Sequence, residues 1–338
     1  MTRQIDNYDL SAHNTFGLKA VCASFIEYDD VADLVAMDFG KMTSPVMHIG
    51  GGSNLLFTGD FPGTVLHSAI RYINTLEEQG DDVLLEVGAG VSFDQFVDWT
   101  CRASLWGAEN LSAIPGEVGA SAVQNIGAYG VEVKDIIERV NCFDTVSSCF
   151  VSFGARECRY GYRDSIFKHP GVKGRYIVTS VLFRLSRKVS LKLEYGGLRR
   201  AFEDTDSLGP SDIRNAVMRI RAEKLPDPSE IGSAGSFFKN PVVDKEFFTI
   251  IAAQYPDVPH YFQTDGVKIP AAWMIERCGL KGACAGGAAV YEKQPLVIVN
   301  AGGKAVAEDI LALENRIISA VKERFGVTLH PEVEHIQS

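Results

Sequence analysis

The sequence predicts a fold that combines helices and strands, of the α/β or α+β class. Short runs of β-type residues alternate with amphipathic helical stretches along the whole chain, which is the pattern of such folds. The 338 residues are enough for two to three domains of about 100–200 residues each. Hydrophobic residues make up 46% and charged residues 22%, which is the composition of a globular protein with a sizeable core.

Several segments have the composition of strands. They are rich in β-branched and aromatic residues, and RYIVTSVLFRLS alternates apolar and polar positions, as a half-buried strand does. The expected strands are VMHI at 46–49, VLLEVGAG at 83–90, much of 131–186 and the terminal VTLHPEVEHI.

Helix ends are also indicated by local signals. Ser92 and Gln95 form a capping-box pattern, which predicts a helix through about Leu105. Ser211 is expected to cap a helix that stops before Pro226, because the residue before a proline avoids helical angles. Further helices are expected over 29–38, 244–255, 271–280 and 304–325, the last ended by Gly326. The segment KLPDPSEIGSAG between helices is a candidate domain boundary.

Charge and cysteine content exclude several classes of protein. Lys and Arg number 33 against 43 Asp and Glu, a net charge of −10, which argues against nonspecific nucleic-acid binding. No apolar run approaches the roughly 18 residues of a membrane span, and MTRQIDNYDLSAHNT lacks the apolar core of a signal peptide. The seven cysteines include no C-x-x-C pair, so neither a disulfide framework nor a zinc knuckle is indicated. We expect a cytoplasmic protein that binds no nucleic acid, membrane or protein partner.

Two glycine-rich loops are the first candidate site. IGGGSNLL at 49–56 follows a strand, and its backbone N–H groups can converge on an anion; a tight turn without a ligand is the alternative. IPGEVGASAVQNIGAYG at 114–130 is either functional or an irregular surface loop. Together they suggest an extended ligand with a pyrophosphate. Neither loop fits the G-x-G-x-x-G or G-x-x-x-x-G-K-[ST] pattern, which disfavours a Rossmann or P-loop fold.

Three polar segments are further candidates. CRYGYRDSIFK at 158–168 contains Arg163, and a solvated turn with local ion pairs is the alternative. Arg221 and Lys224 lie three residues apart near a helix C-terminus, where they either form a solvated face or bind a diphosphate. GSAGSFFKNP at 232–241 presents Ser236 without the G-x-S-x-G pattern of an acyl-transfer nucleophile.

The terminal HPEVEH at 330–335 does not indicate a metal site. Along a strand His330, Glu332 and Glu334 share one face, while His335 points away. A buried carboxylate at Glu332, acting as an acid or a polariser, is the better interpretation.

These motifs together resemble a known family. IGGGSNLL, IPGEVGASAVQNIGAYG, YGYRDSIFK, KLPDP, GSAGSFFKNP and HPEVE occur in this order in the UDP-N-acetylenolpyruvoylglucosamine reductases, and LEYGGL at 193–198 is similar to the tyrosine segment of the type I members. The resemblance runs along essentially the whole chain. It implies NADPH-dependent, FAD-mediated reduction of UDP-N-acetylglucosamine enolpyruvate to UDP-N-acetylmuramate in peptidoglycan synthesis, with FAD held non-covalently.

The resemblance also implies a domain arrangement of the α+β class. An FAD-binding fold of the vanillyl-alcohol-oxidase and p-cresol methylhydroxylase type would occupy two lobes, beside a separate α+β substrate-binding domain. The lobes would be residues 1–69 and 70–225, the second with the C-terminal strand 326–338, and the substrate domain would be residues 226–325.

Site residues follow from the same motifs, position by position. The implied catalytic residues are Ser236, Arg163 and Glu332. The implied FAD-binding residues are Gly50, Gly51, Gly52, Ser53, Asn54, Leu55, Pro115, Gly116, Ser121, Gln124, Asn125, Gly127 and Ala128. The implied substrate-binding residues are Tyr129, Tyr162, Tyr195, Arg221, Lys224 and Asn240, and no metal is implied.

The reaction explains why such residues are needed. Hydride addition at C3 of an enol ether leaves negative charge that spreads from C2 into the attached carboxylate, which Arg163 can hold. C2 then needs a proton, which Ser236 can supply without a Ser-His-Asp triad. Two alternatives are a flavoenzyme of the same fold that oxidises an alcohol or hydroxy acid, and a nucleotide-binding module without catalysis.

Overall fold

The computed structural model describes residues 2–195, 197–203, 205, 207–264 and 266–337. They form two compact units, each built from several stretches of the chain. Unit 1 comprises Met1–Tyr8, Cys22–Gly52 and Pro62–Arg221, and unit 2 comprises Asp9–Val21, Ser53–Phe61 and Ala222–Ser338. The chain therefore passes from one unit to the other in the middle of the first glycine loop, between Gly52 and Ser53.

The first sheet of unit 1 has the order β1-β2-β5-β3. Its strands are β1 (Arg3–Asp9), β2 (Val21–Tyr28), β5 (Phe61–Ser68) and β3 (Val46–Ile49), and β3 runs parallel to β5. The strand expected at 46–49 is thus confirmed. The helix expected over 29–38 is confined to α1 (Val31–Ala36), because the Asp30 side chain accepts the amide of Ala32 and begins the helix there.

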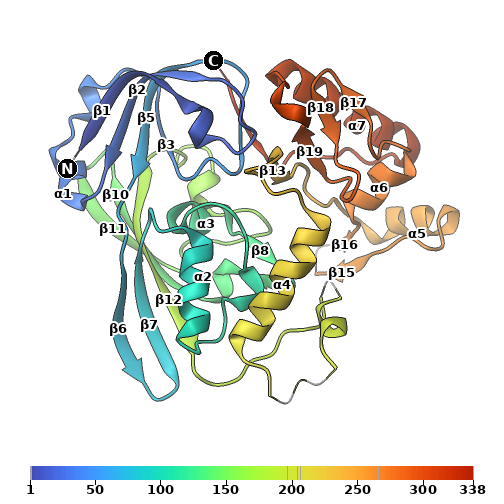
Figure 1. Cartoon of the computed structure of the whole chain (residues 1–338), viewed down its shortest axis with the longest axis horizontal. Helices are drawn as coiled ribbons and strands as arrows, with labels where there is room; N and C mark the ends of the chain where they lie inside the picture. The colour runs from blue at the N-terminus through green and yellow to red at the C-terminus, as the bar shows by residue number, and fades with distance from the viewer. Residues whose placement is uncertain (1, 196, 204, 206, 265, 338) are drawn as a thin grey trace. The chain divides into compact units, whose positions relative to one another are not determined.

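The second sheet of unit 1 is antiparallel, in the order β11-β10-β12-β7-β6. Helices α2 (Phe93–Arg102) and α3 (Val118–Gln124) lie on one face of it (Figure 1). Phe96 of α2 stacks on Phe183 of β12 with ring centroids 4.5 Å apart, within a core of aliphatic and aromatic side chains. The remaining strands of unit 1 are β6 (Ile73–Gln79), β7 (Asp82–Gly88), β8 (Gly127–Ala128), β9 (Val131–Glu132), β10 (Ile137–Asp144), β11 (Cys149–Gly154) and β12 (Tyr176–Ser186).

Unit 2 contains a second core. Its strands are β4 (Leu55–Phe57), β13 (Gly232–Ser236), β14 (Val242–Val243), β15 (Tyr261–Gln263), β16 (Gly266–Lys268), β17 (Cys284–Ala285), β18 (Ala288–Val290), β19 (Val297–Asn300) and β20 (Glu334–Ile336). They form sheets of order β13-β19-β18-β17, β14-β16-β15 and β20-β4. Helices α5 (Lys245–Gln254), α6 (Ala271–Arg277) and α7 (Ala307–Phe325) supply the other side of the core, and α7 packs on β17 and β18.

Short 3₁₀ turns connect these elements. They are η1 (Leu10–His13), η2 (Phe39–Lys41), η3 (Glu109–Leu111), η4 (Val133–Asp135), η5 (Ile166–Lys168), η6 (Leu198–Ala201) and η7 (Ala301–Gly303). Within the described ranges, no helix combines the length and the apolar character that crossing a membrane requires.

One predicted helix cap is wrong and one is confirmed in position only. Ser92 is the N-cap residue of α2, but its side chain makes no cap bond; the amide of Phe93 donates to the Gly116 carbonyl, and α2 stops at Arg102 instead of near Leu105. Helix α4 (Pro210–Lys224) begins one residue before Ser211, since proline suits the first helical position and needs no N–H partner there. The predicted stop at Gly326 is confirmed, because this residue has φ of 72° and donates its amide to Lys322.

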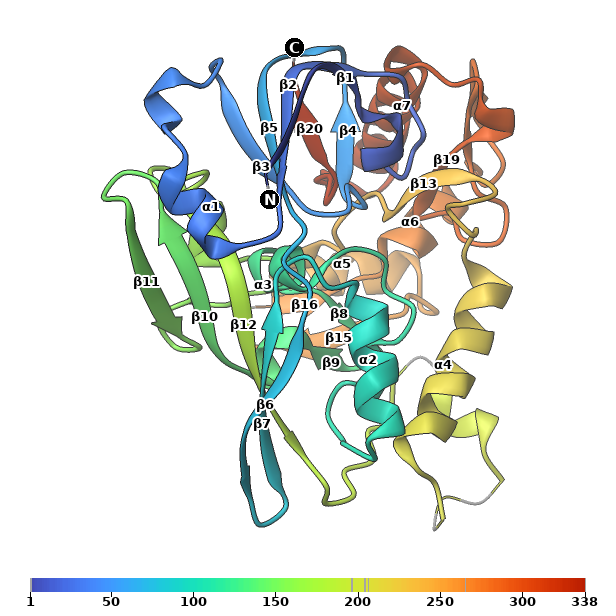
Figure 2. The ribbon, with the colours of Figure 1, turned by 60° about the vertical axis from the view of Figure 1, so that its left-hand side comes forward.

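Three segments differ from their expected form. Residues 114–130 are not a loop throughout, because α3 and β8 lie inside them. Ser236 ends strand β13, although the glycines on both sides of Ala234 suggest a loop in the sequence. The terminal strand extends only over Glu334–Ile336, where it pairs in parallel with β4, side by side in Figure 2.

A buried ion pair joins α2 to α4. The Arg214 guanidinium donates to both oxygens of Asp94, at 2.6 and 2.9 Å, and Arg214 is only 8% exposed. Burial alone would raise the pKa of Asp94, but the Arg214 bonds and the Ala113 amide hold that pKa below its usual value. The pair therefore fixes α4, which carries Arg221 near its end.

We predict that Arg214→Met lowers the free energy of unfolding by about 2–3 kcal/mol. This is somewhat less than the roughly 3–5 kcal/mol lost when one partner of a fully buried ion pair is removed. Asp94 then loses its cationic partner and keeps only the bond from the Ala113 amide. The control is Arg187→Met, whose partner Glu78 and own side chain are both about half exposed, so that a change below roughly 1 kcal/mol is expected. Urea denaturation measures both variants, and equal shifts would contradict this ranking.

Candidate active site

The first glycine loop packs directly on the second. A Cβ at Gly50 would lie 3.0 Å from the Ala120 Cβ and 3.3 Å from Glu117 Oε2, and one at Gly51 would lie 3.6 Å from the Gly116 Cα. Only residues without a side chain allow this approach at Gly50. The structure thus brings the two predicted cofactor loops of unit 1 together, and we call residues 50–52 and 115–128 the glycine cradle.

The second loop of the cradle, residues 115–128, is anchored to the rest of unit 1. Val118 and Gly119 donate their amides to the carbonyls of Val91 and Ala89, and a Cβ at Gly119 would lie only 2.9 Å from the Ala89 Cβ. Asn125 ends α3 at φ of 48°, and its buried side chain donates to the Gly161 carbonyl at 2.7 Å. The Ser121 hydroxyl donates within α3, to Val118 O at 2.7 Å.

Gln124 provides a test of whether a ligand fits the cradle. Its Oε1 accepts a hydrogen bond from Lys168 Nζ at 2.6 Å, whereas its Nε2 is buried with no hydrogen-bond partner among the described residues. A buried donor without a partner is costly in a protein interior. The cradle therefore offers a buried amide donor beside its backbone N–H groups, and a ligand with acceptor oxygens such as the FAD pyrophosphate fits it.

Lys168 is a residue that the sequence analysis missed. Its ammonium also donates to the Arg163 carbonyl at 3.0 Å, so it joins α3 to the segment that carries Arg163. The lysine ends the YGYRDSIFK motif, and its place in that motif was the only signal that could have drawn attention to it.

Arg163 lies against the end of the cradle. Its guanidinium donates to the carbonyls of Gly127 at 2.8 Å and Asn125 at 3.3 Å, and stands 5.3 Å from the centre of the Tyr162 ring. Its backbone has φ of 54°, and Asn125 and Tyr129 nearby in the fold also have positive φ. Such conformations are strained for residues other than glycine and often occur at functional sites.

Tyr129 and Tyr195, two predicted substrate residues of unit 1, lie just beyond this same end of the cradle. Tyr195 lies beside Gly130, where an added Cβ would meet the Tyr195 Cβ at 3.2 Å. The Tyr129 carbonyl accepts a bond from Asn110 Nδ2 at 2.9 Å. Burial raises the pKa of the Tyr129 phenol, while the charge of nearby Arg221 acts in the opposite direction. Burial also lowers the pKa of Arg221.

In unit 2 the structure brings Ser236 and Glu332 onto adjacent segments. The Glu332 amide donates to the Phe237 carbonyl at 2.8 Å, and the Lys239 amide donates to the His330 carbonyl at 2.9 Å. Ser236 is half-buried opposite Val297 of β19, after a register shift at Gly235, which has φ of 68°. We call residues 236–240 and 330–333 the paired segments.

The first glycine loop continues into these paired segments. Asn54 Nδ2 donates to the Glu332 carbonyl at 3.0 Å, and the Glu334 amide donates to the Asn54 carbonyl at 2.9 Å. Leu55 follows in β4, opposite Glu334 of β20. Glu332 itself is half-buried, so the prediction of a buried carboxylate is wrong. Residues 330–333 were expected to belong to the terminal strand, but they precede it.

Asn240 and Lys224 have different surroundings. Asn240 Oδ1 accepts the amide of Ala271 at 2.9 Å, so the side chain also fixes the start of α6. Lys224 is exposed at the end of α4. The predicted residues thus form one set in unit 1, around Arg163 and the glycine cradle, and one in unit 2, around Ser236 and Glu332.

His335 does not belong to either set. Its Nε2 lies 3.1 Å from Glu314 Oε2, and its ring is 6.2 Å from that of Phe237. In the part of the chain that the structure describes, no three His, Cys, Asp or Glu side chains are grouped as metal ligands.

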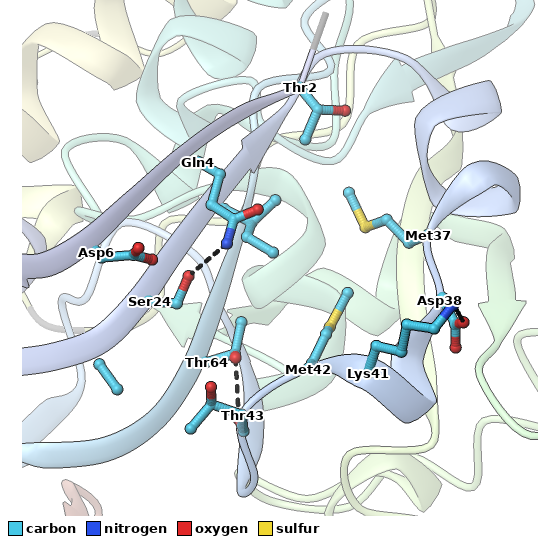
Figure 3. Close-up of a pocket in the computed structure, with 12 residues that line it drawn as sticks. Thr2, Gln4, Asp6, Ser24, Met37, Asp38, Lys41, Met42, Thr43 and Thr64 are labelled. Atoms are coloured by element: carbon cyan, nitrogen blue, oxygen red, sulfur yellow. Dashed lines mark hydrogen bonds and ion pairs between the residues drawn. The ribbon is translucent and has the colours of Figure 1, made fainter.

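A separate pocket of about 650 Å³ lies in unit 1 (Figure 3). Its polar groups already bond one another: Gln4 donates to Ser24 Oγ at 3.1 Å, and Thr64 donates to the Thr43 carbonyl at 2.9 Å. None of the predicted site residues lines it. Its walls are Thr2, Gln4, Asp6, Ala23, Ser24, Ile26, Met37, Asp38, Lys41, Met42, Thr43 and Thr64.

The fold and the cradle define a flavoprotein with an FAD-binding domain of the vanillyl-alcohol-oxidase type and a separate C-terminal domain, as the sequence predicted. Residues 27–147 match the FAD binding domain family, and residues 227–336 match the family of UDP-N-acetylenolpyruvoylglucosamine reductase C-terminal domains.

Relatives match along the whole chain. The chain is 50% identical over 331 residues to the UDP-N-acetylenolpyruvoylglucosamine reductase of Bacteroides fragilis strain YCH46, covering 97% of this chain and 99% of that protein. It is 46% identical to the same reductase of Chromobacterium violaceum, covering 96% of each. A crystal structure of UDP-N-acetylenolpyruvylglucosamine reductase from Thermus caldophilus aligns with a TM-score of 0.69 at 25% identity, covering 99% of this chain and 98% of that one.

The chain therefore belongs to the UDP-N-acetylenolpyruvoylglucosamine reductase family, and it is a flavin-dependent oxidoreductase that uses FAD. This membership sets aside both alternatives, the alcohol-oxidising flavoenzyme and the non-catalytic nucleotide-binding module.

We predict that Gly50→Ala weakens FAD binding about 5- to 150-fold, since overpacking typically costs about 1–3 kcal/mol. The new Cβ would press Ala120 and Glu117 away from the loop. Gly209→Ala is the control, because its Cβ would meet its nearest atom at an ordinary 3.6 Å. Titration of the apoprotein with FAD, followed by flavin fluorescence, measures both. An unchanged FAD affinity in Gly50→Ala would show that the cradle is not part of the cofactor site.

Proposed function

We propose that the chain reduces UDP-N-acetylglucosamine enolpyruvate to UDP-N-acetylmuramate, with NADPH as the reductant and non-covalently bound FAD. The reaction would belong to peptidoglycan precursor synthesis in the cytoplasm. The observation that supports it most is the hydrogen-bonded contact of the paired segments, which puts the Ser236 and Glu332 positions on neighbouring backbones. The names of the relatives identify the substrate class.

The substrate sets the chemical problem. An enol ether is electron-rich at its terminal carbon, so it accepts a hydride poorly unless its carboxylate draws charge away. FAD, reduced by NADPH, supplies the hydride for C3. The protein must then hold the negative charge that spreads from C2 into the carboxylate, and must deliver a proton to C2.

Arg163 is proposed to hold the substrate carboxylate. Its planar guanidinium can bind a carboxylate through two N–H donors, and its bonds to the carbonyls of Gly127 and Asn125 fix its orientation. An oriented cation stabilises charge that develops during the reaction without having to reorganise. Glu332 is proposed to assist at the same carboxylate, which requires that it carry a proton there.

Ser236 is proposed to give its proton to C2. A serine hydroxyl is a very weak acid in water, but a carbanion-like carbon is basic enough to take its proton at hydrogen-bond distance. Ser236 ends β13, and the following backbone is fixed by Phe237 and Lys239, so the hydroxyl is held on a rigid element. Its oxygen regains a proton from water after each turnover.

The other proposed residues bind and orient the ligands. Lys224 and Arg221 bear positive charge near the end of α4, which suits the diphosphate of the UDP group. Tyr129, Tyr162 and Tyr195 present aromatic faces and hydroxyls to the uridine and sugar. Asn240 can donate its Nδ2 to the substrate, since its Oδ1 is already bonded to α6.

The residues proposed to hold FAD are those of the glycine cradle and the loop that follows it. The backbone N–H groups of the glycines among them and the Gln124 amide would bind the pyrophosphate. In unit 1 they are Gly50, Gly51, Gly52, Pro115, Gly116, Ser121, Gln124, Asn125, Gly127 and Ala128, and in unit 2 they are Ser53, Asn54 and Leu55.

We predict that Ser236→Ala retains flavin reduction by NADPH but slows flavin reoxidation by substrate about 10²–10⁴-fold, the usual effect of losing a general acid. The reason is that only the second half-reaction needs a proton at C2. Stopped-flow absorbance of the flavin separates the two halves.

Ser233→Ala is the matched control, since Ser233 lies in the same strand, is buried, and has no proposed role. Reoxidation of Ser236→Ala at the wild-type rate would rule out the proposed role of the serine.

A further inference from the structure

Beneath the glycine cradle lies a buried group of three ionisable side chains that the proposed mechanism does not use. His67 of β5 is 3% exposed, and its ring lies between two carboxylates. Its Nδ1 is 2.9 Å from Glu27 Oε2 on β2, and its Nε2 is 2.9 Å from Glu117 Oε1 in the second loop. We call Glu27, His67 and Glu117 the carboxylate–histidine triad.

The two contacts determine the charge of the ring. An ionised carboxylate only accepts hydrogen bonds, and a neutral imidazole has one donor nitrogen and one acceptor nitrogen. Both nitrogens of His67 face carboxylate oxygens, and two ionised carboxylates would require both nitrogens to donate, which is the arrangement of an imidazolium. Burial works to lower the pKa of His67, but the bonds and charges of Glu117 and Glu27 outweigh it and raise that pKa above its usual value.

The triad is in contact with both halves of the cradle. Glu117 is the residue before α3, and its carboxylate is only 12% exposed. Its other oxygen, Oε2, lies 3.3 Å from the Cβ position of Gly50. A single carboxylate therefore links His67 on the sheet to the first glycine loop and to the start of α3.

The charge of this carboxylate matters for an anionic ligand. An uncompensated carboxylate beside a diphosphate would repel it, and repulsion is weakly screened at a buried position. The imidazolium offsets one of the two negative charges of Glu27 and Glu117. If His67 lost its proton, one bond of the triad would be lost and a second net negative charge would remain under the cradle.

The other ionisable groups packed against His67 do not compensate for such a loss. His48 on β3 has its pKa lowered to about 3, by burial first and then by the charge of His67, so it stays neutral. Its Nε2 is 2.7 Å from the Tyr28 hydroxyl, whose pKa burial raises. The Phe25 ring, 6.2 Å from the His67 ring, is apolar. His67 is thus the cation of this cluster among the described residues.

We propose that His67 is a positioning residue for the cofactor, which as an imidazolium holds Glu117 and the two glycine loops in the geometry that binds the FAD pyrophosphate. This inference rests on the proposed placing of FAD at the cradle. Because proton binding at His67 and FAD binding favour each other, FAD affinity is high while His67 is protonated and falls as the pH rises through its raised pKa. FAD binding near that pH must then take up protons.

The test is to measure the dissociation constant of FAD from the apoprotein between pH 6 and 10 by flavin fluorescence. Titration calorimetry of FAD binding in two buffers then counts the protons that the protein takes up. For the wild type we expect affinity to fall about 10-fold across a midpoint above about 6.5, the usual histidine pKa. His67→Gln should bind FAD weakly at every pH in this range and lose the midpoint. Glu117→Gln removes one carboxylate and should move the midpoint to lower pH.

The control is His48→Gln, which removes a half-buried histidine of the neighbouring strand whose ring bonds the Tyr28 hydroxyl. It should leave the midpoint of FAD binding unchanged even if the protein is less stable. A wild-type affinity that does not vary with pH, or the same midpoint in His67→Gln, would overturn the proposal. If Gly50→Ala weakens FAD binding and His67→Gln does not, FAD binds at the cradle but His67 does not position it. If neither variant changes FAD binding, FAD does not bind at the cradle.

Discussion

The backbone pairing of residues 236–240 with residues 330–333 is the constraint on which the site in unit 2 depends. The Phe237 carbonyl accepts the Glu332 amide, and the Glu332 carbonyl accepts the Asn54 side chain. Three segments that are far apart in the sequence are thereby fixed to one another. The serine and the glutamate are positioned by main-chain hydrogen bonds and by the Asn54 side chain, so their arrangement does not depend on the side chains proposed to act on the substrate.

Unit 1 meets a different requirement, which is to bring two loops close enough to bind one ligand. Gly50 allows the approach, and α3 gives the second loop a rigid base. The approach also crowds polar groups, since it brings the Glu117 carboxylate, which bonds His67, against Gly50. We infer that this crowding accounts for the buried histidine beneath the cradle, since a carboxylate so close to an anion site needs a nearby cation.

Periodicity and glycine content predicted the mixed fold, strand β3 and the end of α7 at Gly326, since each depends on local preferences. The start of α2 after Ser92 was also predicted, although the Ser92 side chain makes no cap bond, whereas the cap at Ser211 was wrong because α4 already begins at Pro210. The site residues came from motifs whose resemblance covers the whole chain, and their roles, like the domain limits, stay predictions. Lys168 and the triad were missed because distant segments contribute their partners, and no spacing in the sequence reveals such contacts.

The direction of the two transfers is the central claim: the hydride goes to C3 and the proton from Ser236 goes to C2. NADPH that carries deuterium at the transferred position, used in ordinary water over a single turnover, tests it directly. We expect all deuterium that reaches the product to be in the methyl group of the lactyl ether, as seen by NMR. Deuterium at C2 would contradict the account, because it would reverse the positions of hydride and proton.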